Sequence, residues 1–283
     1  GRPRRAGPVH GLSPPDGLPP GRRGWAMLTV ILGIGLSVLD SSMLMLALPE
    51  IVRELGIGAR DGVTVVYAYQ IAVLALLLPL SLAGDLFGYR RVYLAGAMLF
   101  AVAATASFLS HGLVQLAAAR ALQGVAAAGL MAVNAALIRL IYPREALGAG
   151  IAINSAVVAG SAVAGPALAS ALLTLADWHW LFVPGIAVAV LVAALGWHSL
   201  PANHAPPPRG ARLPWLDIAL NAATFVLVFV GAQGLAPRGG AAGSAPGGLA
   251  GPMLAGTLLA AGLGVGLVYL RRQRGRVVPL LPV

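Results

Sequence analysis

Two charged residues lie inside apolar stretches and are the first candidates for chemistry. Asp40 is in the middle of "ILGIGLSVLDSSMLMLALP", and Arg120 is in "LAAARALQGVAAAGLM". An ionised group in apolar surroundings is costly unless it is paired, and such residues mark ion or proton pathways. We therefore interpret Asp40 as a group that takes up and releases a proton, with Arg120 tuning it. The alternative is a structural Asp40 that hydrogen-bonds to the backbone or to Ser41 and Ser42.

A second group combines an acid, a glycine and two arginines within the polar segment "AGDLFGYRR". Gly88 permits a sharp turn between two helices, because glycine has no Cβ. Asp85 and Arg90 are spaced to lock this turn to a helix end. Plain flanking charge would account for Arg90 and Arg91, but not for an acid and a glycine at this spacing.

Further polar and small residues fall inside other apolar stretches. Four polar side chains are candidates for lining a substrate cavity, although amides also join helices to one another. These four are Tyr67, Gln70, Asn134 and Asn154. Gly160, Gly165 and Pro166 would allow close helix contact and a bend, or serve ordinary packing. Gly262 and Gly266 form a GxxxG pair that predicts close contact of two helices.

Several kinds of chemistry find no support in the sequence. There is no cysteine, and the five histidines show no metal-ligand spacing. There is no lysine for a phosphate-binding loop and no credible Ser/His/Asp group. We therefore expect no metal, no cofactor and no enzymatic activity.

The elements that position these residues must be membrane helices. Hydrophobic residues make up 58% of the 283 residues, and charged residues only 10%, whereas a soluble domain carries about 25% charged residues. A spanning helix needs about 20 mostly apolar residues. Eight stretches qualify: Trp25–Leu48, Thr64–Leu86, Val92–Leu109, Leu113–Ile138, Leu147–Leu175, Trp180–Leu200, Leu216–Leu235 and Leu249–Leu270. The sequence predicts an all-α membrane protein.

The arginines predict the orientation of these helices. Fifteen would lie on one side: Arg2, Arg4, Arg5, Arg22, Arg23, Arg90, Arg91, Arg139, Arg144, Arg209, Arg212, Arg271, Arg272, Arg274 and Arg276. Three would lie on the other: Arg53, Arg60 and Arg238. The positive-inside rule then puts both ends in the cytoplasm. This asymmetry accounts for the net charge of +10 without a nucleic-acid partner.

The predicted orientation also relates the two intramembrane charges. At 1.5 Å per residue, Asp40 lies about 12 Å and Arg120 about 10 Å below the same outer face. Two opposite charges at one depth should face one another or a shared watery cavity.

Four motifs together resemble those of the major facilitator superfamily, and are most similar to its fourteen-helix drug:proton antiporter branch. They are "LDSSMLMLALP", "AGDLFGYRR", "ARALQGVAAAGLM" and "AGSAVAGPALAS", in the order and on the helices that the family uses. "DWHWLF" and "PWLDIAL" resemble segments before the sixth and seventh helices of that branch. This sequence departs from the family pattern at Ser81, Ala83, Leu86 and Tyr89. His179 stands where the branch usually has arginine.

The resemblance implies a domain organisation. We expect a disordered basic cytoplasmic tail over 1–24, a six-helix N-terminal transporter domain over 25–200 and a cytoplasmic linker over 201–215. Two inserted helices would occupy 216–271, and 272–283 would be a basic cytoplasmic end that leads to a missing C-terminal half. The six helices would form two inverted three-helix repeats.

The resemblance also implies proton-driven export of lipophilic or cationic small molecules by alternating access. Asp40 and Arg120 would couple protons, while Asp85, Gly88, Arg90 and Arg91 would form a cytoplasmic gate. Gly160, Gly165 and Pro166 match the motif that the family associates with antiport. The partners would be substrate, protons and the lipid bilayer of the plasma (inner) membrane, and the full-length protein would be a monomer. The alternatives are a proton-coupled metabolite symporter and a non-transporting truncated protein that acts as sensor or scaffold.

Overall fold

The structure, a computed structural model, describes residues 17–201, 215–235 and 250–273, and these ranges are helical apart from short connections. The α-helices are α1 (Pro20–Glu54), α2 (Ala59–Phe87), α3 (Tyr89–Phe108), α4 (Leu113–Ile141), α5 (Leu147–Leu175), α6 (Val183–Ser199), α7 (Trp215–Leu235) and α8 (Ala250–Gln273). Two short 3-10 helices, η1 (Arg144–Ala146) and η2 (Trp178–Phe182), precede α5 and α6.

The helices are long and apolar, as the sequence predicts. Within the described ranges, seven helices have the length and composition to cross a membrane. The helix at the seventh predicted stretch has a shorter apolar run, Leu216–Ala232. All eight predicted stretches therefore fall on helices, seven of them of full membrane-spanning length.

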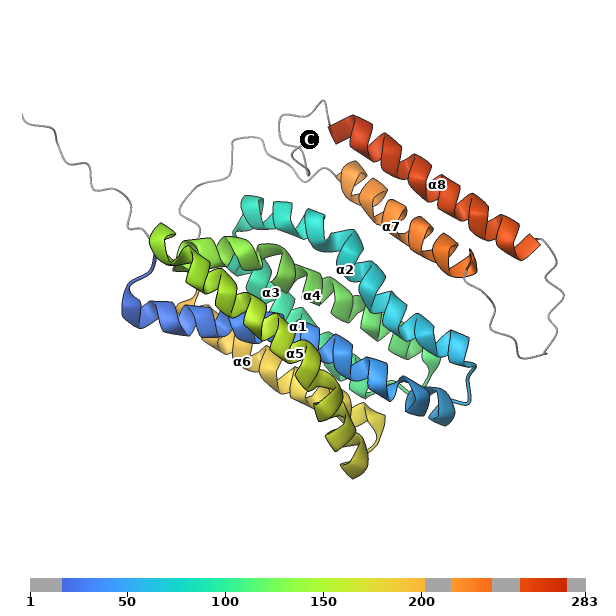
Figure 1. Ribbon diagram of the computed structural model, residues 1–283, viewed down its shortest axis with the longest axis horizontal. Coiled ribbons are helices and arrows are strands. Elements are labelled where there is room, and N and C mark those ends of the chain that lie inside the picture. Colours follow the sequence, from blue (N-terminus) through green and yellow to red (C-terminus); the bar gives the residue numbers. More distant parts are fainter. Residues whose placement is uncertain (1–16, 202–214, 236–249, 274–283) are drawn as a thin grey trace, which may run out of the picture.

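Helices α1 to α6 form one bundle in which two triplets interlock (Figure 1). One triplet is α1 to α3 and the other is α4 to α6. Helix α1 of the first packs against α5 and α6 of the second, and α4 of the second packs against α2 and α3 of the first. Gly124 lets α4 approach α2 closely, because a Cβ there would collide with the Tyr69 carbonyl oxygen. Because the two triplets pack across one another, the middle of α1 lies beside α4. The candidate site is at this contact.

Helices α7 and α8 form a separate pair that lies along α2 (Figure 1). The Asn221 side chain of α7 donates to the Ala75 carbonyl oxygen at 2.6 Å. A Cβ at Gly262 would lie 2.8 Å from the Val228 nitrogen, and one at Gly266 would lie 3.0 Å from Thr224. The contact predicted from the GxxxG pair is confirmed, and it joins α8 to α7.

Two helices begin at other residues than the sequence predicts. Helix α1 begins at Pro20, inside the region predicted to be a disordered tail, because proline suits the first turn of a helix. The sixth helix begins as the 3-10 turn η2 and becomes α-helical at Val183. Residues 1–16, most of the predicted linker (202–214) and the predicted C-terminal end from 274 lie outside the described residues.

Candidate functional site

Asp40 and Arg120 meet inside the bundle. The Arg120 Nη1 lies 2.5 Å from the Asp40 Oδ2, and the two residues are only 1% and 6% exposed, respectively. Asp40 lies in the middle of α1 and Arg120 in the second turn of α4, and these helices pack against one another. The structure therefore brings together the two charges that the sequence places at one depth.

Gln123 completes the ion pair, although the sequence did not predict this residue as part of the site. Its Nε2 donates to the Asp40 Oδ1 at 2.8 Å, and its Oε1 accepts from the Arg120 Nη1 at 2.9 Å. The Ser107 hydroxyl donates more weakly to the same Oε1, at 3.4 Å. A buried ion pair is tolerated only when further hydrogen bonds satisfy its atoms. Gln123 follows Arg120 by three residues and therefore lies on the same helix face. This spacing is the signal in the sequence that could have identified it.

Aromatic rings surround the guanidinium of Arg120. Its Cζ lies 4.5 Å from the ring centroid of Tyr69 on α2 and 6.0 Å from that of Phe182. The Tyr69 hydroxyl is held by donation to the Ser37 carbonyl oxygen on α1 at 3.1 Å. Arginine over an aromatic face is stabilised further when water is excluded. The Arg120 Nε is buried without a hydrogen-bond partner, so the cluster has one unused donor.

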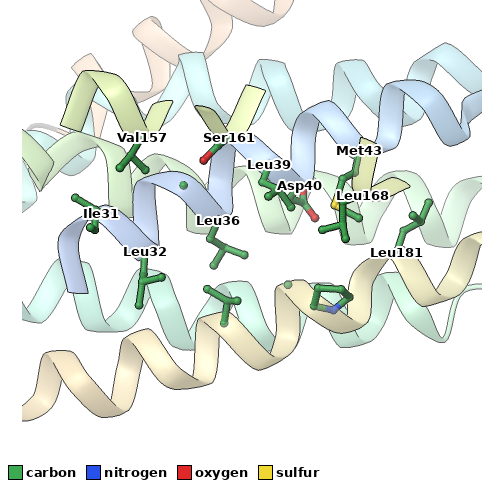
Figure 2. Close-up of a pocket in the computed structure, with 14 residues that line it drawn as sticks. Ile31, Leu32, Leu36, Leu39, Asp40, Met43, Val157, Ser161, Leu168 and Leu181 are labelled. Carbon is green, nitrogen blue, oxygen red and sulfur yellow. The ribbon is translucent and has the colours of Figure 1, made fainter. Parts of the chain in front are cut away.

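Asp40 also lines a cavity of about 330 Å³ between α1, α5 and α6. Figure 2 shows the side chains of Leu32 and Leu36 reaching into the space between α1 and α6, with Asp40 further along α1. Apart from Asp40 and Ser161, the lining is apolar. A ligand in this cavity would therefore meet hydrocarbon along most of its length and one carboxylate.

The four residues predicted to line a substrate cavity are not in this one. Asn134 donates to the Asn154 side chain at 3.0 Å, so this amide pair joins α4 to α5. Tyr67 packs edge-on against Phe229 of α7, with ring centroids 4.8 Å apart. Gln70 is exposed. Neighbouring positions on a helix point in different directions, and Tyr69 is the tyrosine that reaches the site.

The turn between α2 and α3 has the geometry that the sequence predicts. Gly88 has φ of +105° and donates its N–H to the Gly84 carbonyl oxygen at 2.9 Å. Arg90 donates to the Trp197 carbonyl oxygen near the end of α6, and its guanidinium stands 5.9 Å from the Trp197 ring. Arg90 thus ties the turn to a helix end, as expected.

Asp85, which the sequence predicts to help lock this turn to a helix end, has a partner four residues away. The Asp85 Oδ1 accepts from the Tyr89 hydroxyl at 2.5 Å. Tyr89 is one of the positions that depart from the family pattern, so its hydroxyl provides a local donor. Arg91 is exposed.

The small residues of α5 divide between two environments. A Cβ at Gly165 would collide with the Ser42 hydroxyl of α1 and lie 3.2 Å from the Leu39 carbonyl oxygen. A Cβ at Gly160 would meet nothing within 4 Å, and Pro166 is exposed. Gly165 therefore sets the α1–α5 contact, whereas Gly160 and Pro166 lie on the exposed face.

Comparison with known proteins decides the family. Residues 30–282 match the Major Facilitator Superfamily. The chain belongs to this superfamily. It is thus a multi-pass membrane protein of a transporter family.

Several relatives of this superfamily member are known. It is 40% identical to the uncharacterized transporter YebQ of Escherichia coli K12, over 95% of this chain and 56% of the relative. It is 32% identical to the uncharacterized MFS-type transporter Rv1250 of Mycobacterium tuberculosis, over 74% of this chain and 35% of the relative. It is 31% identical to the putative multidrug resistance protein MdtD of Salmonella paratyphi B, over 75% and 45%.

A solved structure supports the same architecture. The human organic anion transporter MFSD10 (TETRAN) superposes with a TM-score of 0.58 at 18% identity, over 80% of this chain and 59% of the other. At this identity the likeness concerns the fold alone. The superfamily chain described here spans about half the length, or less, of the curated relatives it matches.

Proposed function

We propose that this protein, as part of a full-length transporter, exports lipophilic or cationic small molecules in exchange for protons by alternating access. The observation that carries the proposal is the buried cluster of Asp40, Arg120 and Gln123. A paired intramembrane carboxylate is a costly feature that marks ion or proton pathways. The name of one relative, a putative multidrug resistance protein, agrees with the substrate class.

The cluster offers a simple exchange mechanism. Ionised Asp40 is held by the guanidinium of Arg120 and the amide of Gln123. A proton on Asp40 removes its negative charge and therefore its attraction to Arg120. Arg120 then still has Gln123 and the Tyr69 ring as partners. A cationic substrate also needs the ionised carboxylate. Proton and substrate then compete for Asp40, which is the condition for antiport.

The turn after α2 serves as the gate in this proposal. Arg90 connects it to the end of α6. A movement of α6 relative to α2 must therefore either break this hydrogen bond or move the turn together with α6. The arginine asymmetry supports an inner-membrane orientation with this turn in the cytoplasm. Only Gly150, Gly165 and Ala169 of α5 are buried, and we propose that the exposed face of this helix receives the second half of a monomeric transporter.

Export of a fluorescent cation from energised vesicles, measured with the full-length protein across pH, tests the proposal. Asp40→Asn should abolish proton-driven export, because the amide keeps size and hydrogen bonding but cannot exchange a proton. Asp40→Glu should retain part of the activity, since the group still titrates. Full export by the Asn variant would refute the proton-coupling role. A structural aspartate would show the opposite order, with Glu the more harmful change.

A further inference from the structure

A second cavity lies on the contact between α1 and α6, at the arginine-rich end of the bundle. Its volume is about 390 Å³. The residues that line it are Arg22, Trp25, Ala194, Leu195, His198 and Ser199. One end of this contact therefore presents a guanidinium, an imidazole and an indole around a hollow.

The two cavities are aligned along the same pair of helices. On α1 the second cavity is lined from Arg22 and Trp25, and the first cavity continues from Ile31. On α6 the order is reversed, with Ala194 in the second cavity and Val188 in the first. The two cavities therefore follow one another along the contact between these helices. We call this contact, with both cavities, the α1–α6 seam. The side of the first cavity is open, because α5 and α6 both pack on α1 but make little contact with one another.

The chemistry of the seam changes along its length. Its far part is apolar except for Asp40 and Ser161. Its near part carries Arg22, and the three ion pairs found in the described ranges involve other arginines. Trp25 is 59% exposed, and an exposed tryptophan beside basic residues is typical of the level of the lipid headgroups. The combination suits a ligand with an anionic head and a hydrocarbon tail.

We propose that the α1–α6 seam binds one anionic phospholipid from the leaflet on the arginine-rich side. Its phosphate lies at Arg22 and His198, and one acyl chain enters the cavity between α1, α5 and α6. Basic pockets between membrane helices are known to recognise such headgroups. The head site lies apart from the Asp40 cluster, whereas Asp40 is one of the residues that line the cavity for the acyl chain. The proposal does not depend on the proposed transport.

The length of an acyl chain agrees with the length of the seam. One leaflet contributes about 15 Å, half of the roughly 30 Å hydrocarbon core. At 1.5 Å per residue, about 15 Å along α1 from Trp25 reaches Gly35, which lines the first cavity. The chain then ends beside Leu36, about one turn below Asp40. A lipid in this place excludes water from the side of Asp40 that faces α5 and α6.

Quenching by lipids with brominated chains tests the proposal. A cysteine introduced at Leu191, on the exposed surface of α6 between the two cavities, carries a fluorophore in the purified protein, whose sequence has no other cysteine. Brominated phosphatidylglycerol, titrated into micelles, should quench the fluorophore saturably, and brominated phosphatidylcholine should do so only at much higher mole fraction. Equal quenching by the two lipids would overturn the proposal.

Matched variants separate the head from the chain. Arg22→Gln should weaken phosphatidylglycerol binding about fivefold, since one basic residue near the surface contributes roughly that factor. Arg139→Gln, an exposed arginine at the end of α4, should leave it unchanged. Equal effects of the two changes would reduce the head site to general surface charge and so refute it.

Filling the cavity tests the position of the chain. Val188→Trp adds bulk to the cavity wall, whereas Val190→Trp adds it at a residue that is 56% exposed and does not line the cavity. Val188→Trp should abolish the saturable quenching, and Val190→Trp should retain it. Quenching that survives Val188→Trp would refute the position of the acyl chain. Arg22 is exposed, so its variant tests the proposal even if Val188→Trp does not fold.

Discussion

Gln123→Met should destabilise the protein through the charge on Asp40. Methionine matches the length of glutamine but removes the donor to the Asp40 Oδ1 and the acceptor for the Arg120 Nη1. A hydrogen bond to a charged group contributes about 1.5–3 kcal/mol, so the loss of both should cost about 3 kcal/mol. At roughly 2–4 °C per kcal/mol, the melting temperature should fall by about 6–12 °C. Gln115→Met, at an exposed site on the same helix whose side chain accepts from the His111 N–H, is the matched control.

A double-mutant cycle shows whether the effect passes through the carboxylate. In an Asp40→Asn background one of the two partners of Gln123 is neutral, and the hydrogen bond to it contributes about 1 kcal/mol. The hydrogen bond from the charged Arg120 remains. Gln123→Met should then cost about 1 kcal/mol less than in the unchanged protein, because only the bond to residue 40 is weakened. This coupling lies within the range of contacting residues. The assay is thermal unfolding of all four variants in one detergent at one pH. Equal costs in both backgrounds, or a shift no larger than that of Gln115→Met, would refute the account of the cluster.

Three further outcomes are expected. Gly165→Val should lower the melting temperature by several degrees by forcing α5 away from α1, whereas Gly160→Val, where a Cβ meets nothing within 4 Å, should not; similar melting curves would contradict the predicted contact. Asp85→Asn in the full-length protein should slow transport while substrate binding, measured by equilibrium titration, stays within about twofold; normal transport would leave the turn no role as a gate. Cysteines at Ala59 and Arg209 should react from outside and from the cytoplasm respectively with a membrane-impermeant reagent, and labelling of the Ala59 site only after cells are opened would reverse the orientation.

The fold could be predicted because its main determinant is composition. With 10% charged residues, the chain has too little polar surface for water, and the length of each apolar run specifies a helix. The approach of Asp40 to Arg120 could also be predicted, because the rise per residue gives the depth of each charge. Depth requires no knowledge of which helices are neighbours.

The rest of the site depends on rotation about each helix axis, which the sequence leaves open. Tyr67 and Tyr69 are both polar aromatic residues in α2, yet one packs on α7 and the other covers Arg120. Asn134 donates one hydrogen bond to Asn154 across α4 and α5, although either could have faced a cavity. Gln123 resembles any other helical amide until its distance from Asp40 is known. Such choices follow from tertiary packing, since one residue along a helix turns the side chain by about 100°.

The separation of Asp40 and Arg120 along the chain has a consequence for biosynthesis. The two partners are 80 positions apart in the sequence, so at about 5–20 residues per second Asp40 leaves the ribosome roughly 4–16 s before Arg120. A charge at the centre of a lone helix costs about 3 kcal/mol on insertion, and the neighbours of α1 that bury it, α4, α5 and α6, are all made later. The first helix must therefore enter the bilayer on the strength of its own apolar residues. It reaches its final place only after the sixth helix has been synthesised.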